Sequence, residues 1–308
     1  MIKMNFNKLK IEIKDKFKKS IVAVRYNAYY IYSKLLRLTN IKIKYRVINS
    51  IQKKGYNQNM LSGLHSGKIG DLIYALPTIK KLGIKHILIN LSKFLGTDIE
   101  TAKALIPLLI EQDYIKKVSI VYINQCLLVE YLNENQIGIN YNLDRFRNEQ
   151  KVSENHLIFS HANPFKVKID PNEKWLKIRN KKNRYGNYIL INFTDRYRSK
   201  TQEFWQDLLK NSPIKIIGIG LPNEFKNMDK ITNRLITCKD FLEMAELIKN
   251  SKLFIGNQSS AFAIAEGLKV NRILEQSKDI PNVNPLGKNG WIINKLNKNE
   301  FKKIIKNI

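Results

Sequence analysis

The chain has 308 residues, of which 54 are Lys or Arg and 26 are Asp or Glu, and its formal net charge is +28. A length of this order fits about two domains, and a hydrophobic content of 44% excludes wholesale disorder. The cysteines, Cys126 and Cys238, lie far apart, which excludes a disulfide scaffold or a Cys-rich metal site. No long apolar run predicts a spanning helix, and the first residues lack a secretory signal, so we expect a cytoplasmic protein.

The positive charge is concentrated near the N-terminus. Residues 1–57 carry a net +13, residues 288–308 a net +5, and the longer middle, 58–287, only +10. A surplus of this size first suggests nucleic-acid binding. The sequence contains no zinc-finger spacing, aromatic RNA-binding motif or Arg-rich run, so we expect no nucleic-acid partner and keep that function as the least favoured alternative.

Residues 1–40 have the pattern of one long amphipathic helix, because apolar residues recur every three or four positions. The apolar stripe comprises Ile2, Phe6, Leu9, Ile13, Phe17, Ile21, Val24, Ala28, Ile31, Leu35 and Leu38. Lys and Arg residues occupy the opposite face, and tyrosines cluster towards the end of the helix. This combination is typical of a helix on an anionic membrane, which would hold the protein at the inner membrane face. The alternatives are a helix that packs on its own protein, a coiled coil, or a nucleic-acid contact.

The body of the chain alternates between strands and helices. A short strand is expected near residues 41–47. The next predicted strands are 60–65, 86–90, 118–123 and a weaker one at 157–159, with helices at 71–82 and 101–109. After a basic break at 177–187, strands at 188–193, 214–219, 253–255 and 272–274 alternate with helices at 202–210, 241–249, 260–268 and 298–308.

This order predicts an α/β protein with two tandem Rossmann-like domains, each built on a mostly parallel sheet. We expect a basic extension over residues 1–57, a first domain over 58–178, a second domain over 179–287 and a closing basic helix within 288–308.

The first candidate site is the turn between the strand at 60–65 and the following helix. It comprises His65, Ser66, Gly67, Lys68, Ile69, Gly70 and Asp71. Glycines there let backbone amides approach a ligand, although the turn is neither a Walker A sequence nor G-x-G-x-x-G. Asp71 either complements the helix dipole or acts as a general base at the carboxyl end of a strand. His65 is the second candidate base.

The second candidate site begins a later helix and comprises Gly256, Asn257, Gln258, Ser259 and Ser260. Polar side chains beside the amides of a helix start can bind phosphate oxygens, although Ser259 also suits a plain N-cap. Glu266, further along that helix, is a candidate for accepting hydrogen bonds from a ribose diol.

The third candidate site follows the first strand of the second domain. Arg196, Arg198 and Lys200 place three cations just after that strand, where they would suit a diphosphate or form a solvated basic loop. Gly220 ends the next predicted strand and completes this set of candidates.

Together, these segments resemble the family 9 glycosyltransferases, the heptosyltransferase-like group with the two-Rossmann GT-B fold. One part is Gly70-Asp71-Leu72-Ile73-Tyr74-Ala75-Leu76-Pro77, followed by Ile79 and Leu82. The other is Phe254-Ile255-Gly256-Asn257-Gln258-Ser259-Ser260, leading to Ala265-Glu266-Gly267-Leu268. The resemblance covers about residues 58–287 and is weakest over 120–180.

The resemblance implies an inverting, metal-independent glycosyltransferase that needs no cofactor. The first domain would hold a glycan or lipid-linked acceptor beside Asp71, and the second a nucleotide-sugar at the turn that starts at Gly256. Two features depart from the family: its usual Asp-Ser/Thr-Gly is replaced at residues 257–260, and its usual Lys after the first strand of the second domain is replaced by the 196–200 cations. The alternative is a nucleotide-sugar or phosphate-binding protein without turnover.

Overall fold

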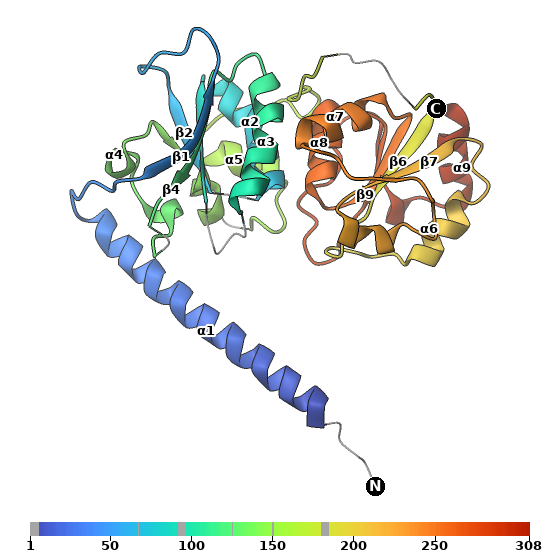
Figure 1. Cartoon of the computed structure of the whole chain (residues 1–308), viewed down its shortest axis with the longest axis horizontal. Coiled ribbons are helices and arrows are strands. Elements are labelled where there is room, and N and C mark those ends of the chain that lie inside the picture. Colours follow the sequence, from blue (N-terminus) through green and yellow to red (C-terminus); the bar gives the residue numbers. More distant parts are fainter. Residues whose placement is uncertain (1–5, 67, 92–96, 125, 150, 180–184) are drawn as a thin grey trace.

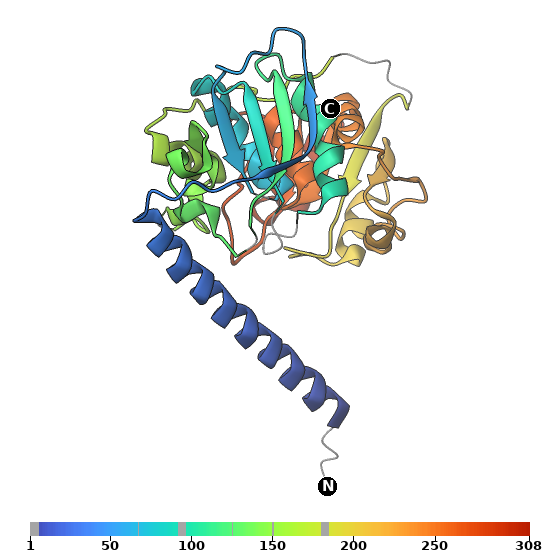
Figure 2. The same ribbon diagram turned by 60° about the vertical axis from the view of Figure 1, so that its left-hand side comes forward.

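The computed structural model describes residues 6–66, 68–91, 97–124, 126–149, 151–179 and 185–308, with the backbone alone for residues 6–19, 21 and 22. Two α/β domains pack side by side, and helix α1 (Phe6–Arg37) projects away from the first of them (Figure 1, Figure 2). The predicted α/β architecture with two Rossmann-like domains is confirmed, and so is the single N-terminal helix.

The first sheet has the strand order β1-β4-β3-β2-β5, with β1 antiparallel and the other strands parallel. Its strands are β1 (Arg46–Gln52), β2 (Ser62–His65), β3 (His86–Asn90), β4 (Lys117–Tyr122) and β5 (Tyr141–Asn142). The helices of this domain are α2 (Ile69–Lys81), α3 (Ile99–Glu111), α4 (Glu134–Ile137) and α5 (Leu157–Ala162), with short 3-10 helices η1 (Val129–Tyr131), η2 (Leu143–Asn148) and η3 (Asn163–Phe165).

The second sheet is parallel throughout, in the order β11-β10-β9-β6-β7-β8. Its strands are β6 (Tyr188–Asn192), β7 (Lys215–Ile219), β8 (Leu235–Ile236), β9 (Leu253–Asn257), β10 (Arg272–Glu275) and β11 (Gly290–Ile292). Its helices are α6 (Gln202–Leu209), α7 (Phe241–Asn250), α8 (Ser260–Leu268) and α9 (Lys298–Asn307), with 3-10 helices η4 (Pro222–Asn227) and η5 (Ile293–Lys295).

Both sheets contain a point where the strand order reverses. The chain proceeds from β2 to β3 and β4 on one side and returns to β5 on the other; in the second sheet the reversal lies between β6 and β9. Ligands of α/β proteins bind at the carboxyl ends of strands beside such switch points. The topology therefore marks one ligand-binding position in each domain.

Three local predictions differ from the structure. Residues 157–159 belong to helix α5 rather than to a strand, because a short buried apolar run suits either element. The strand expected near residues 41–47 begins only at Arg46 and runs to Gln52 as β1, which pairs with β4. The C-terminal segment adds β11 to the second sheet, and α9 buries Phe301 and Ile305 against that domain.

Candidate active site

The two predicted sites that open helices lie against each other. Helix α2 packs on α8 across the domain boundary. A Cβ atom on Gly70 would lie 3.9 Å from the backbone nitrogen of Ser260. Each helix begins after a strand beside a switch point, β2 for α2 and β9 for α8. The positive ends of two helix dipoles therefore meet at one place, which favours an anion.

Asp71 faces a cation that the sequence did not reveal. Arg147 Nη2 lies 3.2 Å from Asp71 Oδ2, and Arg147 Nε lies 3.7 Å from Asp144 Oδ1. Asp144 is fully buried, whereas 19% of the Asp71 side chain is exposed. Burial raises the pKa of Asp71, and the charges of Arg147 and Lys68 oppose that rise. The arrangement leaves one accessible carboxylate, held in place by a guanidinium.

The loop after β2 is fastened to its neighbouring strands. The Ser66 amide donates to Asp144 Oδ2 at 2.8 Å, and its hydroxyl accepts from Asn90 Nδ2 at 3.0 Å. Asn90 Oδ1 in turn accepts from the Ile123 amide at 3.0 Å. Lys68 is exposed directly before α2, and Gly67 lies outside the described residues. The first candidate site, which the resemblance puts on the acceptor side, is thus hydrogen-bonded to neighbouring segments at its β2 end.

His65, the second candidate base, is in the core. Its ring is fully buried, stacks on Phe146 with 5.9 Å between centroids, and lies 5.5 Å from the ring of His161. Burial and the charge of Arg147 lower the pKa of His65 well below its ordinary value, so the ring is neutral. An acceptor hydroxyl has no access to a fully buried ring, so the position does not fit the predicted role of base.

The second and third predicted sites form one structure at the switch point between β6 and β9. The Thr194 amide donates to Asn257 Oδ1 at 3.0 Å, and Asn257 Nδ2 donates to the Arg196 carbonyl. Ser259 caps α8 by accepting from the Phe262 amide, and its hydroxyl bonds to Asn192 Oδ1 at 2.9 Å. The loop after β6 is therefore tied directly to the start of α8.

Three other candidates at this edge have structural partners. A Cβ atom on Gly256 would lie 2.9 Å from the Asn192 carbonyl oxygen, so this position requires glycine. Gln258 is 7% exposed and its amide bridges the Ile280 carbonyl and the Ser277 amide. Gly220 is buried, with its amide bonded to the Ile236 carbonyl. These residues shape the turn that leads into α8 at Ser260.

The cations of the 196–200 loop are not equivalent. Glu275 is fully buried and accepts from Arg198 Nε at 3.0 Å, from the Lys200 amide at 2.8 Å and from Trp205 Nε1 at 2.7 Å. The Arg198 guanidinium is thus bonded to groups that shape its own loop. Arg196 is exposed and Lys200 is partly exposed. These two fit the predicted contact with a diphosphate better than Arg198 does.

Glu266 does not fit the predicted ribose contact. Its carboxylate is fully buried and is bound by Arg272, Lys269 and the Leu286 amide. The next residue, Gly267, accepts hydrogen bonds from the amides of Trp175 and Leu176, so the motif connects α8 to the segment between the domains. Its role in the structure is to hold the fold together.

The sequence analysis missed Asp144 and Arg147, which meet Asp71 from the other side of the switch point. They follow β5, which has only two residues. Charged side chains shortly after a strand also identified the 194–200 loop, where there are three cations, but β5 is too short to recognise in the sequence. Among the residues that the structure describes, no group of three His, Cys, Asp or Glu side chains is arranged to hold a metal ion. Metal independence remains a prediction.

The sequence matches no protein-family model and no curated protein. The structure is similar to solved glycosyltransferases. The E. coli heptosyltransferase WaaC, solved with ADP-2-deoxy-2-fluoro heptose, has a TM-score of 0.56 and 11% identity over 80% of this chain and 99% of its own. A glycosyl transferase of family 9 from Veillonella parvula DSM 2008 has a TM-score of 0.57 and 10% identity, covering 82% and 98%. E. coli ADP-heptose lps heptosyltransferase II has a TM-score of 0.56 and 9% identity, over 80% of this chain and 99% of its own. The chain therefore has the two-domain GT-B fold of the heptosyltransferases and of family 9, as residues 70–77 and 254–268 predict.

Proposed function

We propose that the protein is an inverting, metal-independent glycosyltransferase that moves a sugar from a nucleotide-sugar to a glycan or lipid-linked acceptor. The observation that supports the proposal is the close approach of Gly70, the residue before Asp71, to the start of α8: a Cβ atom on Gly70 would lie 3.9 Å from the Ser260 backbone nitrogen. A base and an anion-binding helix start are the two parts that such a transfer requires. WaaC was solved with an ADP-heptose analogue, so ADP-heptose is the first donor to test.

In this reaction, Asp71 removes the proton from an acceptor hydroxyl while that oxygen attacks the anomeric carbon. The bond from the anomeric carbon to the diphosphate breaks, and the nucleoside diphosphate leaves with the bonding electrons. The α8 dipole, Arg196 and Lys200 stabilise the charge that develops on the leaving group. Arg147 is a positioning residue, because it orients the Asp71 carboxylate and does not itself exchange a proton.

Nucleotide binding tests the donor half of the proposal. We expect ADP to raise the Tm of the full-length protein, since a ligand at 100 times its Kd stabilises the folded state by about 2.7 kcal/mol. Arg196→Gln should weaken the shift, and Arg179→Gln, a change at another exposed Arg, should leave it intact. If neither ADP nor UDP shifts the Tm, the donor site is wrongly placed. Release of ADP from ADP-heptose is then measured, because an enzyme releases ADP and a binding protein without turnover does not.

We also propose that α1 holds the enzyme on an anionic membrane. The end of α1 is docked on the first domain: Ser33 Oγ accepts from the Leu128 amide at 2.9 Å, Leu36 is buried, and Gln136 Nε2 donates to the Leu36 carbonyl at 2.8 Å. This contact uses the face of the helix opposite the apolar stripe, since Ser33 lies half a turn away from it. Packing on its own domain therefore does not cover the stripe.

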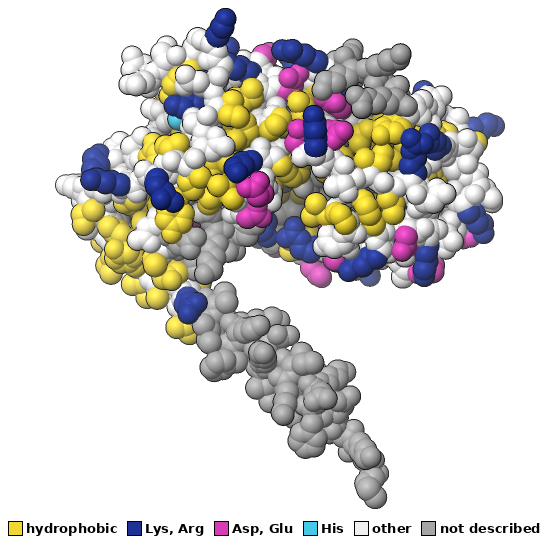
Figure 3. Space-filling model, in the orientation of Figure 1, with side chains coloured by type: hydrophobic (Ala, Val, Ile, Leu, Met, Phe, Trp, Pro, Cys, Tyr) yellow, Lys and Arg dark blue, Asp and Glu magenta, His cyan; other side chains and the backbone are white. Residues whose placement is uncertain are grey.

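The described part of the stripe is exposed to solvent. Its large residues are Val24 (68% exposed), Ile31 (56%), Leu35 (58%) and Leu38 (85%). Hydrophobic side chains also gather on the first domain near the point where α1 leaves it (Figure 3). Among the described residues, no helix is both long and apolar enough to cross a bilayer. The basic residues of the helix are the feature that favours an anionic surface.

Liposome flotation tests this proposal. We expect the double variant Ile31→Asn/Leu35→Asn to bind vesicles of phosphatidylglycerol and phosphatidylcholine at least about tenfold more weakly, since burying one such side chain is worth about 1.5–3 kcal/mol. The matched control is Leu221→Asn in the second domain, where Leu221 is also 58% exposed. Equal flotation of the wild type and the double variant would contradict the proposal. A wild-type dimer that the double variant loses, with no flotation, would identify the stripe as a coiled-coil seam.

A further inference from the structure

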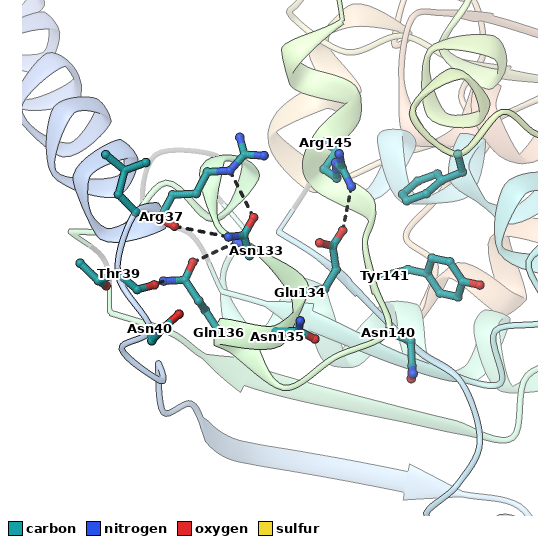
Figure 4. Close-up of a pocket in the computed structure, with 12 residues that line it drawn as sticks. Arg37, Thr39, Asn40, Asn133, Glu134, Asn135, Gln136, Asn140, Tyr141 and Arg145 are labelled. Atoms are coloured by element: carbon teal, nitrogen blue, oxygen red, sulfur yellow. Dashed lines mark hydrogen bonds and ion pairs between the residues drawn. The ribbon is translucent and has the colours of Figure 1, made fainter.

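Two cavities lie at the base of α1, away from the donor side of the molecule. Their volumes are about 510 and 350 Å³, and they share Arg37, Asn133, Glu134 and Arg145 in their linings. Volumes of this size are typical of small-molecule sites. Figure 4 shows the larger cavity, with Arg37 from the end of α1 on one side, Arg145 and Tyr141 on the other, and α4 between them.

The linings combine amide groups with nearly balanced charge. The larger cavity is lined by five amides; those of Asn133, Gln136 and Asn140 are hydrogen-bonded to neighbouring residues, whereas Asn40 and Asn135 are exposed. The ion pair between Arg145 Nη1 and Glu134 Oε1, 3.1 Å long, neutralises part of the charge in both cavities, and Glu130 and Glu149 offset Arg37 in the smaller one. An amide both donates and accepts hydrogen bonds, as a sugar hydroxyl does. Taken together, the two linings hold two arginines against three glutamates, so they have no net positive charge to attract a free anion.

One short helix connects these cavities to the active site. In η2, Asp144 and Arg147 are three residues apart and contact the Asp71 site, while Arg145 and Asn148, also three apart, line the smaller cavity. A 3-10 helix has three residues per turn, so each pair occupies its own side of η2. Glu130 also lines the smaller cavity, and burial and the charge of Asp144 raise its pKa to about 7. A ligand in the cavities thus contacts the same element that positions the base.

We propose that the paired cavities at the base of α1 bind the neutral saccharide portion of the acceptor. The inference rests on the proposed glycosyl transfer and names its acceptor subsite. The exposed amides of Asn40 and Asn135 bind the hydroxyl groups, and the edge-to-face pair Tyr141–Phe165, 5.7 Å between centroids, offers an aromatic surface beside them. The subsite lies next to the docked end of α1, so a saccharide carried by a membrane lipid reaches it from the surface on which α1 lies.

Direct saccharide binding tests the inference without depending on turnover. The probe is an array of immobilised neutral oligosaccharides of various lengths, with a matched set that carries phosphate or carboxylate groups, and full-length labelled protein is applied to it. We expect binding to members of the neutral set and at least tenfold weaker binding by Asn135→Trp, because Asn135 is exposed and its enlarged side chain fills the larger cavity. Asn59→Trp is the matched control, since Asn59 is exposed in the same domain and lines neither cavity.

Three outcomes would overturn the inference: no binding to either set, binding that Asn135→Trp leaves unchanged, or preferential binding of the charged set. The ADP-induced shift in Tm is measured on the same samples. An ADP shift without saccharide binding would remove only the subsite. Saccharide binding that Asn135→Trp abolishes, in a protein with no ADP shift, would keep the subsite and remove the donor half of the proposed function.

Discussion

Asp71→Asn is expected to lower the rate of sugar transfer by about 10²- to 10⁴-fold, the usual contribution of a positioned base. The amide has the shape of the carboxylate but cannot take the proton of the acceptor hydroxyl. It leaves the start of α2 and the packing of α2 on α8 in place, so the ADP-induced shift in Tm should be unchanged. Initial rates of ADP release in the presence of acceptor give the measurement. Turnover close to that of the wild type would show that another group is the base.

The pH profile separates a base from a merely structural carboxylate. Burial raises the pKa of Asp71, so kcat/KM should fall as the pH drops through that raised value and the carboxylate becomes protonated. Arg147 opposes the rise, and Arg147→Gln should therefore move the acidic limb of the profile to higher pH. Arg147→Lys keeps the positive charge and should move it less. A profile that neither substitution changes would contradict the assignment of Asp71 and Arg147 as a functional pair.

Glu266→Ala is expected to destabilise the protein by about 3–5 kcal/mol, because it leaves the buried Arg272 guanidinium without a countercharge. Chemical denaturation followed by tryptophan fluorescence provides the measurement. The control is Glu203→Ala, which breaks an exposed ion pair of 2.9 Å with Lys230 and should change the stability little. If Glu266 instead held a ribose, Glu266→Ala would abolish ADP binding. The variant protein would then unfold at the same denaturant concentration as the wild type.

Much of the fold could be predicted because the buried parallel strands are continuous apolar runs. Residues 86–90 and 188–192 are examples, and both lie where the sequence placed them. The same reasoning failed at residues 157–159, which form a buried helix with equally apolar side chains. It also could not assign β1 to a sheet, since antiparallel pairing with β4 connects segments that are far apart in the chain.

The parts of the candidate site that could be predicted are the turns at the starts of α2 and α8. The Gly70-Asp71 turn and the Ser259-Ser260 turn were found because glycine and N-cap residues follow apolar strands. Which side chains face a ligand depends on partners from distant segments, and the sequence does not show these. Glu266 and His65 are residue types that often bind ligands, but both are buried in the core. Arg147 was not recognised because β5, the strand before it, has only two residues.

Side-chain and backbone contacts join the last turns of α1 to the first domain. A flexible tether would fix only the distance between a protein and its anchor. The contacts of Ser33 and Leu36 instead hold the last turns of α1 against the first domain, so the helix has a defined direction relative to that domain. Whatever covers the stripe from Val24 to Leu38 therefore also sets the direction in which the meeting point of α2 and α8 faces. Attachment of the helix to a surface would therefore also orient the first domain relative to that surface.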